Sequence, residues 1–171
     1  MRKIIILMFL SILNLSCIAK VKLESGSLCC LKGEKTVAVC LDLTRIKYNK
    51  DLPFKDFLSL GRRVTDWKER SLDYFVKEFN DECYKRNLSV TTHSRGTKYI
   101  LVLTPLVVYN DGSISGNAYL CEVGSTKLEA TMVFKSDDGD NDDPITFKDP
   151  MDELGESFAK LFIREIKKAN K

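Results

Sequence analysis

Residues that usually build catalytic centres are scarce in this sequence. Its 171 residues include one histidine, His93, and six cysteines, none of which form a Cys-x-x-Cys pair. There is no His-Glu-x-x-His zinc motif, no Gly-x-Ser-x-Gly nucleophile elbow and no glycine loop of the phosphate-binding type. The sequence therefore names no reaction, and we expect no cofactor and assign no metal ligand.

Proline and glycine are also few, at four and nine residues, and no repeat or low-complexity linker interrupts the chain. This composition excludes collagen-like and wholly disordered proteins. A chain of this length with 44% hydrophobic residues can bury one core without disulfides or a metal. We therefore expect one ordinary domain.

Long apolar runs are missing except at the N-terminus. Arg2 and Lys3 precede residues 4–15, which are apolar at all but two positions, and small residues close the run at Cys17 and Ala19. A dozen apolar residues fall short of the roughly 20 that a membrane-spanning helix needs, and this layout is typical of a secretory signal. We therefore expect an exported protein that is periplasmic or associated with the outer membrane.

Two kinds of processing fit this segment. Cleavage after Ala19 would remove a signal peptide of residues 1–19, whereas lipoprotein processing would remove residues 1–16 and leave Cys17 acylated. In the second case the lipid on Cys17 would be the protein's contact with a membrane. Both alternatives leave one α+β domain, which we place at residues 20–171.

Charge of one sign is not in excess once the leader is set aside. The full chain carries 27 basic and 24 acidic groups, a formal charge of +3. Removal of residues 1–19 takes away Arg2 and Lys3 and no acid, which leaves 25 basic groups and a charge of +1. Because basic and acidic residues are mixed along residues 42–70, we interpret them as a solvated surface and expect no nucleic-acid partner.

Five cysteines follow Cys17, so at least one thiol has no intrachain partner even in an oxidising compartment. Cys40 lies in an apolar strand segment, and Cys83 lies on the apolar stripe of a helix. We interpret the cysteines mainly as small buried hydrophobic residues, with room for one disulfide. The alternative is a thiol- or metal-dependent enzyme that uses His93 and a free cysteine.

Hydrophobic periodicity predicts six strands and two helices in the order β-β-α-β-β-β-β-α. Apolar residues alternate in the strand segments and recur every three to four residues in the helical ones. The predicted strands are residues 27–31, 36–46, 88–92, 98–109, 113–122 and 127–135, and the predicted helices begin at Asp66 and Asp149. The expected fold class is α+β, with one mainly antiparallel β-sheet packed against two α-helices.

Particular residues refine this expectation. Pro105 cannot donate to a strand ladder, so its strand should lie at an edge or carry a bulge. Leu128 and Phe134 belong to the predicted buried face of the last strand, and Trp67 is expected to close one end of the core. The last helix has Pro150 at its predicted first position. Its C-terminal half is rich in cations, which the negative end of the helix dipole favours.

The sharpest chemical feature is the acidic segment 137–143, which runs from Asp137 to Asp143. Its carboxylates are the kind of oxygen ligand that calcium prefers. However, Gly139 stands at the third position of an EF-hand loop and Lys148 at the twelfth, where that loop needs ligands. We interpret the segment as a solvated loop, and calcium-dependent adhesion through it is an alternative.

Short motifs are spread along most of the chain. They are the run 27–42, Trp67 with Glu69, Phe79 with Asn80, Tyr99 with Leu101 and Val102, Asp111 and Gly112 with Gly116, and Glu153 to Gly155 with Phe158. Together they resemble small exported, lipoprotein-like Bacteroidetes proteins of unknown function. The acidic segment 137–143 replaces the glycine-rich segment that this resemblance implies. The outline is also similar to that of small envelope lipoproteins that act as scaffolds.

An export signal followed by a domain without a recognisable reactive set favours a non-enzymatic protein. We expect an envelope protein that binds or scaffolds an envelope protein or ligand that the sequence does not identify.

Overall fold

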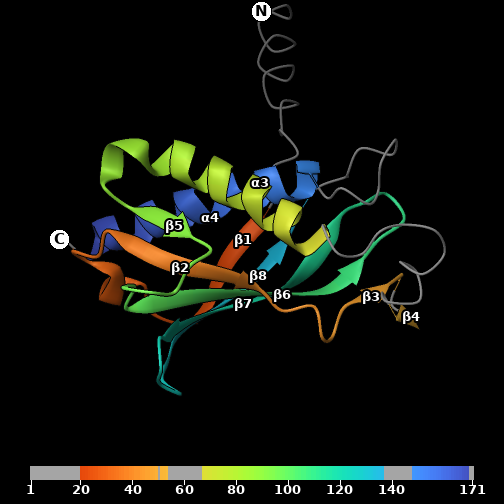
Figure 1. Ribbon diagram of the computed structural model, residues 1–171, viewed down its shortest axis with the longest axis horizontal. Helices are drawn as coiled ribbons and strands as arrows, with labels where there is room; N and C mark the ends of the chain where they lie inside the picture. The colour runs from red at the N-terminus through yellow and green to blue at the C-terminus, as the bar shows by residue number, and fades with distance from the viewer. Residues whose placement is uncertain (1–19, 50, 54–66, 137–147, 170–171) are drawn as a thin grey trace, which may run out of the picture.

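One sheet organises the fold, and the computed structural model describes it within residues 20–49, 51–53, 67–136 and 148–169. Six strands follow the order β1-β8-β7-β6-β2-β5, while β3 pairs with β6 and β4 pairs with β3. The strands are β1 (Lys20–Gly26), β2 (Thr36–Leu41), β3 (Lys47–Tyr48), β4 (Leu52–Pro53), β5 (Ser89–Thr91), β6 (Tyr99–Val108), β7 (Ile114–Glu122) and β8 (Leu128–Lys135). Helices α3 (Trp67–Cys83) and α4 (Lys148–Lys168) cover one face of this sheet (Figure 1).

The sheet is mixed. Strands β1, β8, β7 and β6 pair in antiparallel fashion, whereas β2 pairs in parallel with both β5 and β6. The chain leaves β2, forms α3 on the sheet face and returns in β5 beside β2, and such a crossover joins parallel strands. Within the described residues, an α+β fold with one sheet and two α-helices is therefore confirmed. The predicted antiparallel pairing holds for only part of a sheet that has eight strands instead of six.

The prediction of a strand at residues 27–31 is wrong. Leu28 and Leu31 are both buried at a spacing of three, and the backbone forms the 3-10 helix η1 (Cys29–Leu31). Pairing begins earlier, in β1, where Val21 and Leu23 pack against the core. The apolar alternation of β1 is weak because an edge strand keeps charged residues beside its apolar ones.

Strand β6 accommodates Pro105 through a bulge. The register with β7 shifts between Pro105 and Val107, and β6 is bordered by β7 on one side and by β2 and β3 on the other. Because β2 pairs with residues 100–103 and β3 with residues 107–108, Pro105 lies both at the bulge and in the gap between these two strands, where its missing N–H is tolerated. Gly116 faces this point, and a Cβ there would lie only 2.3 Å from the Thr104 carbonyl oxygen.

Two finer predictions need correction. Leu128 is 51% exposed, because a register shift in β8 places it opposite Cys121 instead of on the buried face with Phe134. Helix α4 begins at Lys148, so Pro150 lies inside the first turn and not at its first position. The side chain of Trp67 lies outside the described residues, as do the acidic segment 137–143 and the leader 1–19.

Helices α3 and α4 are parallel and pack through phenylalanine rings. The ring centroids of Phe75 and Phe158 are 5.6 Å apart, and those of Phe79 and Phe162 are 5.5 Å apart, both edge to face. Because the residue numbers rise together along this contact, the two helices advance in the same direction (Figure 1). Both helices therefore end on the same side of the domain.

Candidate functional site

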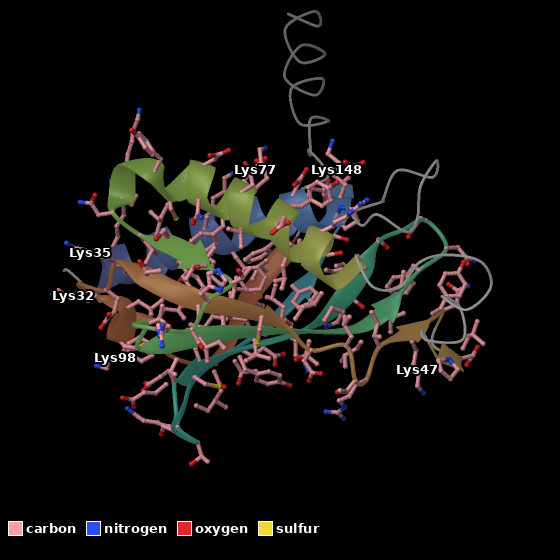
Figure 2. The ribbon with its side chains drawn as sticks, viewed as in Figure 1. Lys32, Lys35, Lys47, Lys77, Lys98 and Lys148 are labelled. Carbon is pink, nitrogen blue, oxygen red and sulfur yellow. The ribbon has the colours of Figure 1, made fainter. Side chains whose placement is uncertain are left out.

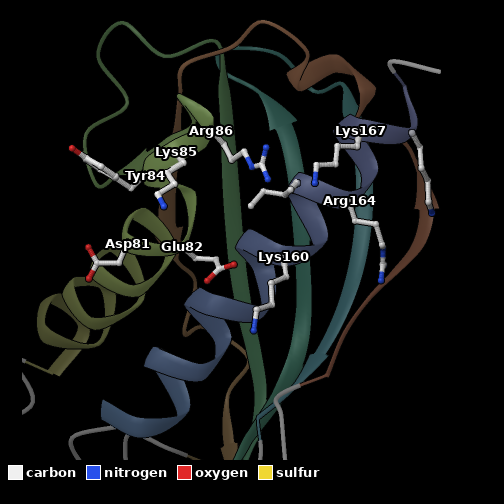
Figure 3. A pocket seen from close by; sticks show the side chains of 10 residues that line it. Asp81, Glu82, Tyr84, Lys85, Arg86, Lys160, Arg164 and Lys167 are labelled. Carbon is white, nitrogen blue, oxygen red and sulfur yellow. The ribbon is translucent and has the colours of Figure 1, made fainter.

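The parallel helices leave a cleft beside their C-terminal ends. The end of α3 and the following 3-10 helix η2 (Tyr84–Arg86) form one wall, and the last turns of α4 form the other (Figure 3). Its volume is about 710 Å³, which is within the range of small-molecule sites. We call this site the basic cleft. Six of its side chains are cationic: Lys85, Arg86, Lys160, Arg164, Lys167 and Lys168.

Three of these cations have acidic partners on α4. Lys160 pairs with Glu156 one turn earlier, and Lys168 Nζ and Arg164 Nε lie 2.8 Å and 3.1 Å from Glu165 Oε1. The hydrogen bond from Lys168, together with that from Arg164, lowers the pKa of Glu165 from its ordinary value. The basic partners of these pairs are exposed to solvent, so each pair contributes less than about 1 kcal/mol and mainly neutralises charge.

The other three cations are different. Within the described ranges, no ion pair involves Lys85, Arg86 or Lys167. Figure 3 shows Arg86 and Lys167 extending toward each other from opposite walls, while Asp81 points away from α4 and the Glu82 carboxylate points toward α4. The like charges of Arg86 and Lys167 repel each other, whereas an anion bound between them would attract both.

Helix dipoles explain part of this concentration of charge. Each helix C-terminus carries the equivalent of about half a negative charge, so two ends together offset about one cation. Six cations therefore face Asp81 and Glu82, which line the same cleft, the paired Glu156 and Glu165, and the two helix ends, which leaves an excess of about one positive charge. Lys32, Lys35 and Lys98 lie on the same side of the domain (Figure 2).

A second hollow of about 450 Å³ adjoins the basic cleft, because Tyr84 lines both. Its other lining residues are mostly uncharged: Lys35, Thr36, Asn80, Asn87, Leu88 and Ser89. Tyr84 itself is 84% exposed, an unusual position for a large aromatic ring. We call this second space the polar hollow.

Cys83 is one of the cysteines that the enzyme alternative could combine with His93, and its burial does not suit that role. His93 is exposed in the turn after β5, as expected for a surface residue, whereas Cys83 is fully buried at the end of α3. Burial raises the pKa of the Cys83 thiol to about 11 and also raises the pKa values of Cys30 and Cys121. A raised pKa leaves little thiolate at neutral pH, and the thiolate is the nucleophile.

The remaining predictions concern disulfides, metal binding and contact with a membrane. Cys29, Cys30, Cys83 and Cys121 are thiols outside any disulfide. Among the described residues, no group of three or more His, Cys, Asp or Glu side chains is placed to hold a metal ion. No described helix has both the length and the apolar character needed to cross a bilayer. Cys17 and the segment 137–143 lie outside the described residues, so lipidation and calcium binding stay predictions.

Comparison with known proteins adds no family. No family model matches the chain, and no curated protein matches it. Solved structures with a similar outline include a PelC dodecamer from Paraburkholderia phytofirmans, which is 10% identical over 81% of this chain and 97% of its own, with a TM-score of 0.44. A variant of the same PelC has 12% identity, covers 81% and 98%, and has a TM-score of 0.40. An uncharacterised protein has 11% identity, covers 78% and 90%, and has a TM-score of 0.37.

Proposed function

We propose that this chain is an exported, non-enzymatic binding protein of the cell envelope, and that the basic cleft is its site for an anionic ligand. The observation that carries the proposal is the approach of Arg86 and Lys167 from opposite walls without a described acidic partner. Guanidinium and ammonium groups are the donors that bind carboxylate and phosphate most strongly.

Binding needs less from this site than catalysis does. An anion is held by cationic hydrogen-bond donors, and the lysine and arginine side chains of the basic cleft supply them. A thiol enzyme would need a thiolate, and burial of Cys83 opposes its formation. These points favour a binding protein over the enzyme alternative that uses His93 and a cysteine.

Isothermal titration calorimetry with inorganic pyrophosphate tests the proposal. We expect wild-type protein to bind, and the double variant Arg86→Glu, Lys167→Glu to bind at least about tenfold more weakly because charge-assisted hydrogen bonds become repulsive contacts. The matched control is Lys20→Glu, Lys22→Glu, which reverses the same number of exposed charges on the edge strand β1. Equal losses in the two double variants, or no binding by wild-type protein, would contradict the proposal.

A further inference from the structure

We infer that the ligand is an acidic sugar chain, which runs from the basic cleft across Tyr84 into the polar hollow. This inference rests on the proposed function of the basic cleft and adds the chemical class of its ligand. Three observations carry it: the two spaces share the lining residue Tyr84, the Tyr84 side chain is exposed, and the two linings differ in polarity.

The shared lining residue favours an extended ligand. Tyr84 lines both the basic cleft of about 710 Å³ and the polar hollow of about 450 Å³, so the two spaces adjoin and a ligand of several units could contact both. A lone phosphate group would occupy only a small part of either volume. A chain of several linked units would contact both.

The exposed ring favours a sugar unit at the junction. Tyr84 stands on η2 with 84% of its surface exposed, and its ring lies toward the outer side of that helix (Figure 3). Tyrosine offers a flat apolar face together with a hydroxyl group, and it loses little side-chain entropy on binding. A sugar ring has a matching apolar C–H face and hydroxyl groups at its rim.

The change in polarity indicates where the acidic groups lie. The polar hollow has one cation, Lys35, and otherwise offers uncharged groups such as the Thr36 hydroxyl and the Asn87 amide. Such groups suit the hydroxyls of a sugar, whereas the basic cleft suits carboxylate or phosphate. A chain that carries both hydroxyl and acidic groups on each unit therefore fits the two spaces better than an inorganic polyanion does.

A membrane surface fits less well. Besides Tyr84, the large apolar residues exposed in the described chain are Leu52, Val123 and Leu128, which do not line either space. Interfacial membrane binding needs an apolar face that enters the lipid, and here the cations line a concave space. Anionic vesicles nevertheless belong in the test, because a lipid headgroup also presents phosphate.

The test compares hexameric oligogalacturonate with neutral maltohexaose by calorimetry. We expect binding of the acidic hexamer and none of the neutral one. Tyr84→Ala should weaken oligogalacturonate binding by about tenfold through loss of the stacked ring, and Tyr84→Phe should retain most of the affinity. Pyrophosphate binding should be the same in all three proteins, because it needs only the cations.

The possible outcomes separate the two proposals. If pyrophosphate binds but oligogalacturonate does not, or if Tyr84→Ala leaves oligogalacturonate affinity unchanged, the sugar-chain inference is overturned while the basic cleft remains a binding site. If vesicles of phosphatidylglycerol and phosphatidylcholine sediment the protein and oligogalacturonate does not bind, the ligand is a membrane and the inference is also wrong. If no anion binds, both proposals fail.

Discussion

At the scale of single residues, Asn80 holds the short strand β5 against helix α3. Its Nδ2 group donates to the Val90 carbonyl oxygen at 3.0 Å, and its Oδ1 atom accepts from the Val90 N–H at 2.7 Å. Val90 is buried, so water cannot easily replace this partner. The polar hollow lies against the same strand, which makes Asn80 a determinant of its shape.

We predict that Asn80→Ala lowers the free energy of unfolding by about 2–3 kcal/mol, because a buried backbone N–H and C=O lose their partners together. Urea denaturation followed by circular dichroism measures this loss. Asp81→Ala, at the exposed position next to Asn80, should change the free energy by less than about 0.5 kcal/mol. Similar losses in the two variants would show that the hydrogen bonds between Asn80 and Val90 make no particular contribution to the free energy of unfolding.

The buried thiol of Cys83 gives the protein a predicted alkaline dependence. Burial raises its pKa from 9.0 to about 11, so the unfolded chain gives up this proton at a lower pH than the folded chain does. The resulting stability is fully present below pH 9 and is lost as the pH rises toward 11. The loss from this one group should be about 1–2 kcal/mol by pH 10.5.

Urea denaturation of wild type and Cys83→Ala at pH 8.5 and pH 10.5 measures this effect. Other groups titrate in both proteins, so the difference between them isolates the thiol. We predict that the difference in the free energy of unfolding between wild type and Cys83→Ala falls by about 1–2 kcal/mol from pH 8.5 to pH 10.5. The same difference in the free energy of unfolding at both pH values would contradict the raised pKa of the Cys83 thiol.

At the scale of elements, the contact between α3 and α4 depends on the absence of a side chain at Gly155. A Cβ at this position would lie 2.5 Å from the Phe75 carbonyl oxygen and 3.1 Å from the Phe79 nitrogen. The close approach brings the phenylalanine rings of both helices together and sets the spacing of the walls of the basic cleft.

We predict that Gly155→Ala destabilises the protein by about 1–3 kcal/mol, because the helices must move apart. In an exposed helix the same change would stabilise by about 1 kcal/mol, so the sign of the effect is diagnostic. Thermal and urea denaturation measure it, with Glu156→Ala at the neighbouring, more exposed position as the control. A stabilised Gly155→Ala protein would show that the helices do not approach closely.

The elements also show where sequence patterns predict structure well. Helix α3 and strands β6 and β7 lie close to their predicted bounds, because a single strong period extends over each. The strand prediction fails at Leu28 to Leu31 because four apolar residues in a row fit either a strand or a helical turn. The parallel pairing of β2 could not be predicted from local pattern, since it depends on the route of the chain between strands.

Only the cations of the α4 wall of the basic cleft could be predicted from the sequence. The cations in the C-terminal half of α4 are expected from the helix dipole, whereas the sequence analysis gives no role to Lys85 and Arg86. An adjacent lysine and arginine directly after a helix could have drawn attention to them. Their meeting with Lys167 depends on two helices, far apart in the sequence, that run in the same direction, and no local pattern encodes that arrangement.

At the scale of the whole molecule, charge is nearly balanced in number but unevenly placed. With residues 1–19 set aside the formal charge is +1. Among the described residues, the six cations of the basic cleft lie on the same side of the domain as Lys32, Lys35 and Lys98 (Figure 2). Such a distribution attracts anions over a distance of about 10 Å at moderate salt. We therefore expect anion binding to weaken as the salt concentration rises.

Mass spectrometry of the protein isolated from its native cells tests the export proposal. We predict a chain that begins at Lys20, or one that begins at Cys17 and carries the added mass of two or three acyl chains. Either result fits a protein of the envelope. A chain that still begins at Met1 would contradict export.

The most direct test of the basic cleft is chemical-shift mapping of the isotope-labelled protein during titration with inorganic pyrophosphate. We predict that amide shifts concentrate at residues 81–87 and 160–168 and saturate with a single dissociation constant. Shifts concentrated instead on the sheet face away from the helices, or shifts scattered over the surface without saturation, would contradict the basic cleft as the binding site.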